Sequence, residues 1–432
     1  MSGTSEATVL LLLIGLAGST LLLVRISRKV EDFLHAATLF SLVWGLNVLA
    51  CEVLPYQSLR LDIRTLVVAI AAWWMFLLGF LGAVSFRWPV LRGRATVDPT
   101  RAKMLLAALI GLQMVAIVLE MQQSGLLAGQ PSLWGQLGSL AGRRTSGAMA
   151  EIHLPSMWAL WRWDFTLYLP LAFVIYRGGW LRPRALVGVI LLAAGSALLR
   201  FTRAPLLDVM TITIVGAAIA RPAGEKVWQA ARRRLAVIVL AFGAFAGLFI
   251  AMQMVLASSA RESPVPAGQA LMEYVGGPLS AYQDLLRHGE WTPSARVYSL
   301  DALDFVAFKL GLKATYGGTV RPYTDVGVPT NIYTYLDAFT LDAGVFGAFA
   351  GSLVLGVGVG WLSYLVRKRG SYWSVVMYSY SAYNCLMVGV NNQFIQFSFF
   401  LWAGIALVLG FLISERSVSP VGPDTALQTG KN

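Results

Sequence analysis

The sequence predicts an all-α polytopic membrane protein with about 11 transmembrane helices, and three observations support this fold class. Apolar and aromatic residues make up 57% of the 432 residues, whereas charged residues make up only 13%, about half the share of a soluble protein. The apolar residues lie in long blocks, as helices that cross a bilayer require. Lys and Arg gather in alternate connections between the blocks. This composition disfavours a soluble enzyme, a nucleic-acid-binding protein and a disordered chain, although the net charge is +12.

Eleven apolar blocks are candidates for spanning helices, which need roughly 17 to 25 residues each. The blocks are residues 8–24, 33–54, 65–86, 104–121, 158–176, 185–200, 204–220, 235–257, 338–366, 372–390 and 395–413. The sixth and seventh are short and share a tight turn at Arg200–Arg203. A re-entrant pair is the alternative for these two, although the alternation of charge disfavours it. Glu6 before the first block and Arg25 after it disfavour a cleaved signal peptide.

Basic connections set the predicted orientation. The connections after the first, third, fifth, seventh and ninth blocks, together with the tail, hold most of the 34 Lys and Arg residues. By the positive-inside rule these segments face the cytoplasm. We therefore expect an external N-terminus and a cytoplasmic tail at 415–432. Residues 1–414 are expected to form a single integral membrane domain that includes two long external loops, 122–157 and 258–337.

The larger external loop is predicted to carry amphipathic helices that lie at the membrane interface. Gln269–Arg287 and Tyr298–Leu312 alternate apolar and polar residues near the helical period. The first is expected to break at Gly276-Gly277-Pro278. Loops of this length are more often functional than idle.

Polar side chains within the blocks concentrate near the predicted outer ends. The main ones are Glu52, Glu120, Arg162, Asp164, Arg200, Arg203, Asp208, Asp337, Asp342, Asn391 and Asn392. Insertion of such residues into a membrane is unfavourable in free energy, and they are usually functional. A one-sided distribution predicts a cavity that opens outward, whereas a transporter needs polar groups near the midplane. The alternative for any single residue is an interfacial side chain or a structural ion pair.

Arginine is the side chain best suited to bidentate binding of phosphate, so these arginines suggest a lipid-linked pyrophosphate. Arg203 is the leading candidate because it precedes Pro205 at a helix start, where anions are favoured; an ion pair with Asp208 is the alternative. The further pyrophosphate candidates are Arg143, Arg144, Arg321 and Arg200, with a solvated or interfacial charge as the alternative.

Carboxylates and aromatic rings complete the predicted site. The candidate general bases are Glu273, Asp337, Asp325 and Glu151. The candidate sugar-binding residues are Asn331, Tyr333, Tyr335 and Tyr274, with loop positioning or helix capping as the alternative. Cys51 and Cys385 lie within apolar blocks, and the three histidines lack metal-ligand spacing. We expect no metal and no cofactor.

Several short motifs resemble a known family. Pro329-Thr330-Asn331-Ile332-Tyr333-Thr334 gives an N-x-Y-T element, and Asp342 begins a D-x-G-x-x-G element that enters a predicted helix. Tyr274–Pro278, Arg143-Arg144 and Phe201–Leu207 provide further matches, the last with Thr where Ser is usual. With the topology and the length, these motifs resemble bacterial oligosaccharide repeat-unit polymerases, the Wzy-type O-antigen polymerases.

The resemblance implies a GT-C-like architecture in the bacterial inner membrane, with an active site that faces the periplasm. Such enzymes of lipopolysaccharide biosynthesis transfer the growing glycan from undecaprenyl pyrophosphate to the non-reducing end of an incoming lipid-linked unit. The implied partners are undecaprenyl-pyrophosphate-linked oligosaccharides and membrane lipids, with a chain-length regulator as a further candidate. No nucleotide sugar is used, in keeping with the lack of a P-loop or Rossmann glycine motif in the sequence.

Two alternative functions remain at the level of sequence. An O-antigen ligase or another GT-C glycosyltransferase uses related lipid-linked donors, but the first outer loop carries only Asp62 where the usual GT-C enzymes have an acidic motif. A transporter or flippase is the alternative from another class. It predicts internal sequence symmetry and charges near the midplane, and the sequence shows neither.

Overall fold

The computed structural model describes residues 6–30, 35–53, 60–86, 88, 96–123, 164–198, 203–219, 267–288, 297–314, 324–325, 329–330, 334–389 and 393–414. These residues are almost entirely helical. Their only strands are β1 (Thr324–Asp325) and β2 (Pro329–Thr330), which pair antiparallel with Thr324 opposite Thr330. The prediction of an all-α fold is therefore confirmed for the described part of the chain.

The predicted apolar blocks coincide with helices. In chain order these are α1 (Glu6–Val30), α2 (Ala36–Val53), α3 (Ile63–Ser85), α4 (Pro99–Gln123), α7 (Phe165–Arg177), α8 (Pro183–Leu198), α9 (Arg203–Ile219), α13 (Leu336–Lys368), α14 (Tyr372–Met387) and α15 (Phe397–Ile413). The block 235–257 lies outside the described residues. Four of the described helices, α1, α3, α4 and α13, are long and apolar enough to cross a membrane. The chain is therefore a helical membrane protein in its described part.

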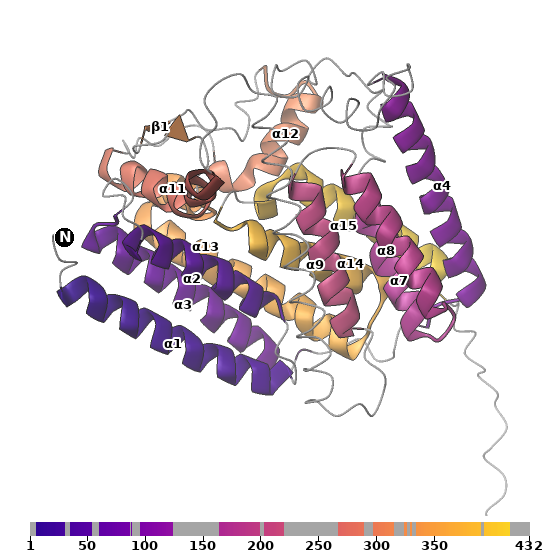
Figure 1. The fold of residues 1–432 in the computed structure, drawn as a ribbon, viewed down its shortest axis with the longest axis horizontal. Helices are drawn as coiled ribbons and strands as arrows, with labels where there is room; N and C mark the ends of the chain where they lie inside the picture. The colour runs from indigo at the N-terminus through magenta and orange to yellow at the C-terminus, as the bar shows by residue number, and fades with distance from the viewer. Residues whose placement is uncertain are drawn as a thin grey trace, which may run out of the picture.

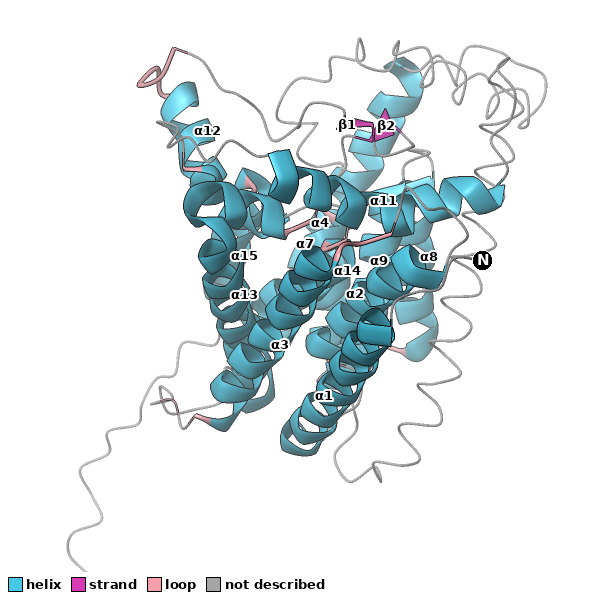
Figure 2. Cartoon of the chain, turned by 90° about the vertical axis from the view of Figure 1, so that its left-hand side faces the viewer, coloured by secondary structure: helices cyan, strands magenta, loops and turns pink. Residues whose placement is uncertain are grey.

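The segment between α9 and α13 contributes further elements, which lie together at one end of the helices (Figure 2). They are α11 (Ala267–His288), the short helix η3 (Tyr298–Leu300), α12 (Asp301–Lys309) and the β1–β2 pair. We call this the α11 end. The remaining element, η4 (Gln393–Ile395), is the short turn before α15.

Contacts between helices fix how several of them run. A Cβ at Gly15 would meet Ile70 and one at Gly18 would meet Trp74, so α1 and α3 are parallel. At the end opposite α11, Arg367 Nη1 donates to Lys29 O at 3.2 Å, which joins the ends of α13 and α1. At the α11 end, Tyr335 N–H donates to Val388 O at 3.0 Å, which joins the start of α13 to the end of α14. The helices α13 and α14 therefore run in opposite directions.

The helices form two groups that share α9 and α14 (Figure 1). One buried core joins α1, α2, α3, α11 and α13, and the other joins α4, α7, α8 and α15, while α9 and α14 contribute to both. Within the first core, the rings of Phe40 and Phe76 stack at 3.8 Å. Large apolar side chains that face outward, such as Leu13 on α1 and Phe411 on α15, are 59% and 80% exposed, as expected for surfaces that lipid covers.

Close packing of α3 against α13 depends on glycine. A Cβ at Gly356 would lie 2.1 Å from Phe76 O, and one at Gly360 would lie 2.7 Å from Phe80 O. The Gly356-x-x-x-Gly360 pattern therefore serves close helix packing.

The block 338–366 matches α13, which carries a kink that the sequence analysis did not predict. The kink lies where Gly344 takes a φ of +64°, a conformation that glycine alone adopts readily. The predicted break at Gly276-Gly277-Pro278 is absent, since α11 continues through Pro278. Residues 276–283 are buried against neighbouring helices, and this burial offsets the hydrogen bond that a proline removes.

Candidate active site at the α11 end

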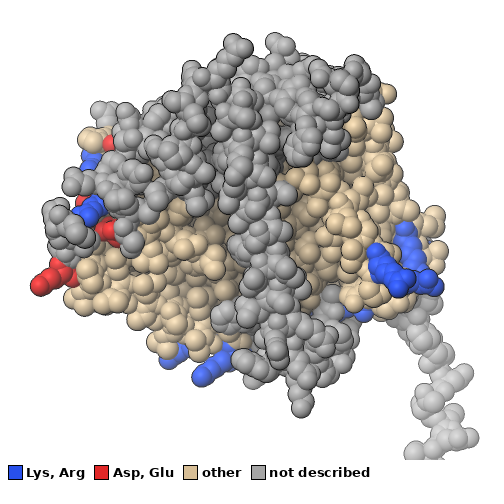
Figure 3. Space-filling view, viewed as in Figure 1, with Lys and Arg blue, Asp and Glu red and all other residues tan. Residues whose placement is uncertain are grey.

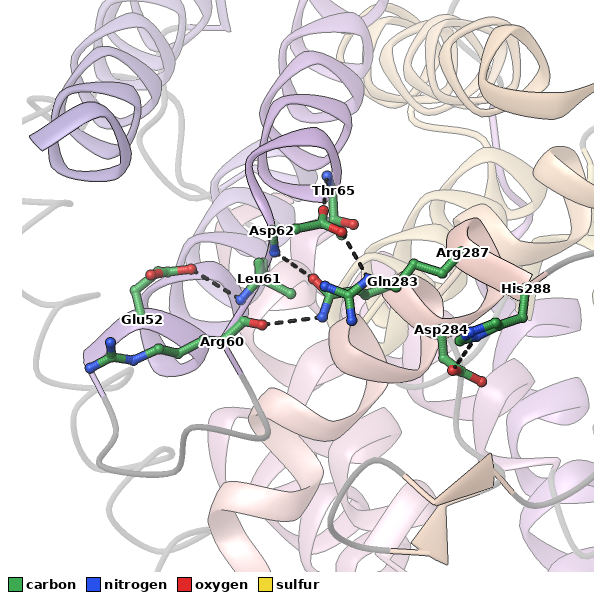
Figure 4. A network of polar contacts seen from close by, with 9 residues as sticks. All are labelled: Glu52, Arg60, Leu61, Asp62, Thr65, Gln283, Asp284, Arg287 and His288. Atoms are coloured by element: carbon green, nitrogen blue, oxygen red, sulfur yellow. Dashed lines mark hydrogen bonds and ion pairs between the residues drawn. The ribbon is translucent and has the colours of Figure 1, made fainter. Parts of the chain in front are cut away.

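Hydrogen bonds attach α11 to the connection between α2 and α3 (Figure 4). The Gln283 side chain makes two hydrogen bonds to this connection. Its Oε1 accepts from Asp62 N–H, and its Nε2 donates to Arg60 O at 3.2 Å. Arg287 Nε donates to Asp62 Oδ2 at 3.0 Å. Glu52 at the end of α2 accepts from Leu61 N–H at 3.3 Å. The helix α11 is therefore docked on the connection between α2 and α3.

The charge state of Asp62 follows from these contacts. Burial alone would raise the pKa of this carboxyl, but hydrogen bonds from Thr65, together with the Arg287 guanidinium, hold the pKa below its usual value. Asp62 also caps α3, because its Oδ1 accepts from Thr65 N–H at 2.7 Å. One ionised side chain thus starts a transmembrane helix and holds α11.

A second set of contacts joins α11 to the start of α13. The Tyr282 and Thr340 hydroxyls lie 2.8 Å apart. Burial, with a smaller contribution from the nearby Asp337 charge, raises the pKa of Tyr282 above its usual range despite the hydrogen bond to Thr340. Asp342 Oδ1 and Oδ2 accept from the N–H groups of Tyr298 and Ser299 at 2.6 and 2.7 Å. Asp342 of α13 thus binds the first two N–H groups of η3.

A buried polar cluster lies between α7, α9 and α14. Asp208 in α9 is 1% exposed, and Thr166 of α7 approaches it. Neither carboxylate oxygen of Asp208 meets the geometry of a hydrogen bond to the described residues. Tyr380 and Tyr383 of α14 interact electrostatically with this carboxylate, and their rings stack at 5.8 Å. A carboxylate buried in this way lowers stability on the order of several kcal/mol unless a partner compensates it.

Three buried carboxylates of the described chain lie at the α11 end: Glu52 at the end of α2, Asp301 at the start of α12 and Asp337 at the start of α13. The other two lie deeper along the helices. Asp164 interacts with Tyr372, the first residue of α14, and Asp208 interacts with Tyr380 in the middle of α14. Figure 3 shows the surface charge on one face: Lys and Arg lie along the lower edge and at the lower right, and at the left they lie beside Asp and Glu. Buried ionisable groups that gather in one region mark a candidate functional site.

Most predicted site residues fall where side chains are not described. Arg203 begins α9, as predicted, although its side chain is not described. Glu273 and Tyr274 lie in α11 and Asp325 lies in β1, again without described side chains. The residues outside the described ranges are Arg143, Arg144, Glu151, Arg200, Arg321, Asn331 and Tyr333. Their roles stay predictions.

Two predicted residues have described side chains. Asp337 is 8% exposed, and its Oδ1 accepts from Ala338 N–H at 2.7 Å. Tyr335 is fully buried; its hydroxyl lies 2.8 Å from Ser352 Oγ, and its ring meets Trp44 edge-on at 5.1 Å. This placement gives Tyr335 a packing role and leaves no surface of its ring open to a sugar.

Sequence reasoning missed the contribution of α14. Tyr380 and Tyr383 line the polar cluster, and the neighbouring Asn384 is fully buried without a described hydrogen bond. Polar residues within the apolar block 372–390 were the available signal. Comparisons with protein-family models, with curated proteins and with solved structures find no match to this chain.

The arrangement suits chemistry on an anionic substrate near a membrane surface. The N-terminus of α9 directs free backbone N–H groups toward the α11 end, where they favour an anion. The buried carboxylates of the same region can accept protons. An anion-binding helix start beside proton acceptors is the combination that group transfer from a phosphate ester requires.

Proposed function

We propose that the chain is a polymerase of lipid-linked oligosaccharide repeat units. It transfers the growing glycan from undecaprenyl pyrophosphate to the non-reducing end of an incoming undecaprenyl-pyrophosphate-linked unit. In this proposal the protein lies in the bacterial inner membrane with about 11 spans and a GT-C-like arrangement, and the α11 end faces the periplasm.

The observation that most supports the proposal is the group of buried carboxylates at the α11 end. Glu52, Asp301 and Asp337 gather there, beside the docked α11. A carrier that moves its substrate across the bilayer places polar groups near the midplane. Polar groups at one end suit an enzyme whose substrate stays in one leaflet.

The proposed reaction assigns a task to each group. The acceptor hydroxyl attacks the anomeric carbon of the growing chain, the bond from that carbon to the pyrophosphate oxygen breaks, and the hydroxyl proton passes to a carboxylate. Arg203 and the N-terminus of α9 bind the departing pyrophosphate. Asp337, which faces the Tyr282 region of α11, is the candidate base with a described side chain.

The test is an assay with purified protein in lipid nanodiscs. Incubation with lipid-linked repeat units is expected to give a ladder of longer glycans with release of undecaprenyl pyrophosphate. Arg203→Ala should lower ladder formation at least tenfold, because removal of a preorganised charge at a developing anion has an effect on the order of 10² or more. Arg184→Ala is the matched control, since Arg184 is exposed at the other end of the molecule.

The products also separate the alternatives. A ligase would add one glycan to a lipid acceptor without a ladder, and a flippase would move lipid-linked units without making any glycosidic bond. Full activity of Arg203→Ala would remove Arg203 from the site. The absence of any glycan product in the presence of authentic substrate would remove the polymerase.

A further inference from the structure

A cavity of about 390 Å³ opens at the end of the molecule opposite α11, between the C-terminal ends of α1, α3 and α13. It lies far from the candidate active site, at the other end of the same helices. Its described lining residues are Lys29, Val30, Val84, Ser85, Phe86, Tyr364, Arg367 and Lys368. Three of them are cations, and none of the described lining residues is acidic.

Arg367 is held in place within this cavity. Its Nε donates to Ser363 O at 3.1 Å and its Nη1 donates to Lys29 O at 3.2 Å, so the guanidinium joins α13 to α1. Lys29 and Lys368 are exposed beside it. Helix C-termini carry partial negative charge, which accounts for some of this basic charge. Here the Lys29 carbonyl is already occupied by Arg367, and two further ammonium groups remain available.

The chain segments around the cavity contain more basic than acidic residues. Glu31 and Asp32 follow α1 in the chain and lie outside the described residues. Segments 25–32 and 367–369 together contain Arg25, Arg28, Lys29, Arg367, Lys368 and Arg369 against these two acids. An anion therefore meets a net positive field even when both acids are counted.

Aromatic side chains place the cavity at the level of lipid headgroups. Phe86, a lining residue that is 59% exposed, meets Trp88 edge-on at 4.9 Å. Trp88 in turn meets Trp361 at 6.5 Å, and Trp361 meets Trp373 at 6.4 Å. Tryptophans concentrate at the boundary between hydrocarbon and water. The exposed Val24 and Leu21 lead from the cavity along α1 into the apolar zone, where acyl chains can lie.

We propose that this cavity binds the phosphate headgroup of an anionic phospholipid from the leaflet at this end of the helices. The cations contact the phosphate, and the acyl chains lie against the exposed apolar residues of α1 and Phe86. Basic pockets between transmembrane helices bind anionic headgroups in this way. The site is independent of the polymerase proposal, because it uses no residue of the α11 end.

The test measures lipid binding to the full chain in detergent by native mass spectrometry and thermal shift. The probes are phosphatidylglycerol, phosphatidylcholine and inorganic phosphate. Phosphatidylglycerol is expected to bind and raise the melting temperature, whereas phosphatidylcholine does neither. The double variant Lys29→Gln/Lys368→Gln should weaken phosphatidylglycerol binding on the order of tenfold, given the contribution of each basic residue near a charged headgroup. Arg367 stays in place because it holds α1 to α13.

The matched control is Arg182→Gln/Arg184→Gln, which removes the same charge from exposed positions at the start of α8, outside the cavity. This variant should bind phosphatidylglycerol as the wild type does. Equal losses in the two double variants would show a general surface attraction and overturn the site. Stabilisation by inorganic phosphate to the same extent as by the lipid would overturn its assignment to a phospholipid.

Discussion

Asp208 tests whether the buried polar cluster acts in chemistry. Asparagine keeps the shape of the side chain and removes the charge that burial penalises. We expect Asp208→Asn to keep or raise the free energy of unfolding, by about 1 kcal/mol, and to lower ladder formation at least tenfold. Thermal unfolding and the glycan assay measure the two effects separately.

The control for this variant is Asp284→Asn, since Asp284 lies at the same end in an exposed contact with His288. It should change neither quantity. An Asp208→Asn protein that is less stable yet fully active would assign Asp208 to an ion pair that holds α9, the structural alternative that the sequence left open.

Asp62 makes the docking of α11 sensitive to acid. Its pKa is lowered in the folded protein because its hydrogen bonds to Thr65 and Arg287 outweigh burial. A lowered pKa contributes stability above the unfolded value of about 3.9, and this contribution is lost as the pH falls through the folded value. We therefore expect α11 to become more accessible to protease below about pH 4.

Arg287→Gln removes one cause of the lowered pKa. This variant should weaken the docking of α11 at neutral pH and reduce the further loss on acidification. Lys309→Gln on α12 is the control and should keep the wild-type pH profile. A profile that Arg287→Gln leaves unchanged would show that the acid sensitivity arises at another group.

At the scale of helices, the sequence predicted where each helix lies in the chain, but it did not predict where a helix kinks or continues. The blocks 204–220 and 372–390 match α9 and α14 within a few residues, because apolar length alone determines a spanning segment. The kink at Gly344 lies beside Asp342, which contacts η3 in the folded chain. The continuity of α11 depends on the helices that bury it. These tertiary causes leave no local pattern in the sequence.

The candidate site shows the same division. Arg203 could be placed at a helix start from Pro205 and the apolar block that follows. The partnership of Asp208 with Tyr383 could not be predicted, because it joins helices separated by a long stretch of chain. Tyr335 was predicted to bind sugar because it follows the N-x-Y-T element, but its side chain turns into the core. Only the three-dimensional structure distinguishes an inward from an outward tyrosine.

The contact between α3 and α13 provides a prediction at the scale of elements. Gly356→Ala would place a Cβ 2.1 Å from the Phe76 carbonyl oxygen, so the helices must move apart. We expect a loss of stability of about 1–3 kcal/mol, measured by unfolding in SDS from mild detergent. Gly358→Ala is a close control in the same helix, because nothing lies within 4 Å of its Cβ position. If both variants are equally stable, close packing at Gly356 does not hold the helices together.

At the scale of the whole molecule, the direction of each helix follows from charge and from the alternation of the helices. The predicted orientation places the α11 end outside the cytoplasm and the basic connections inside. Cys51 and Cys385 are both fully buried, so the wild-type chain offers a silent background for labelling with a membrane-impermeant maleimide. Single exposed positions can then report which side of the membrane they face.

We expect Leu312→Cys, at the α11 end and 76% exposed, to be labelled on spheroplasts. Arg184→Cys, in the first turn of α8 and away from the α11 end, should be labelled only after permeabilisation. Lys226→Cys and Ser259→Cys flank the block 235–257 and test whether it crosses the membrane. If it does, Lys226→Cys is protected and Ser259→Cys is labelled. Labelling of Lys226→Cys and Ser259→Cys from the same side would remove this span, because α9 and α13 run in the same direction and the chain between them must then cross elsewhere.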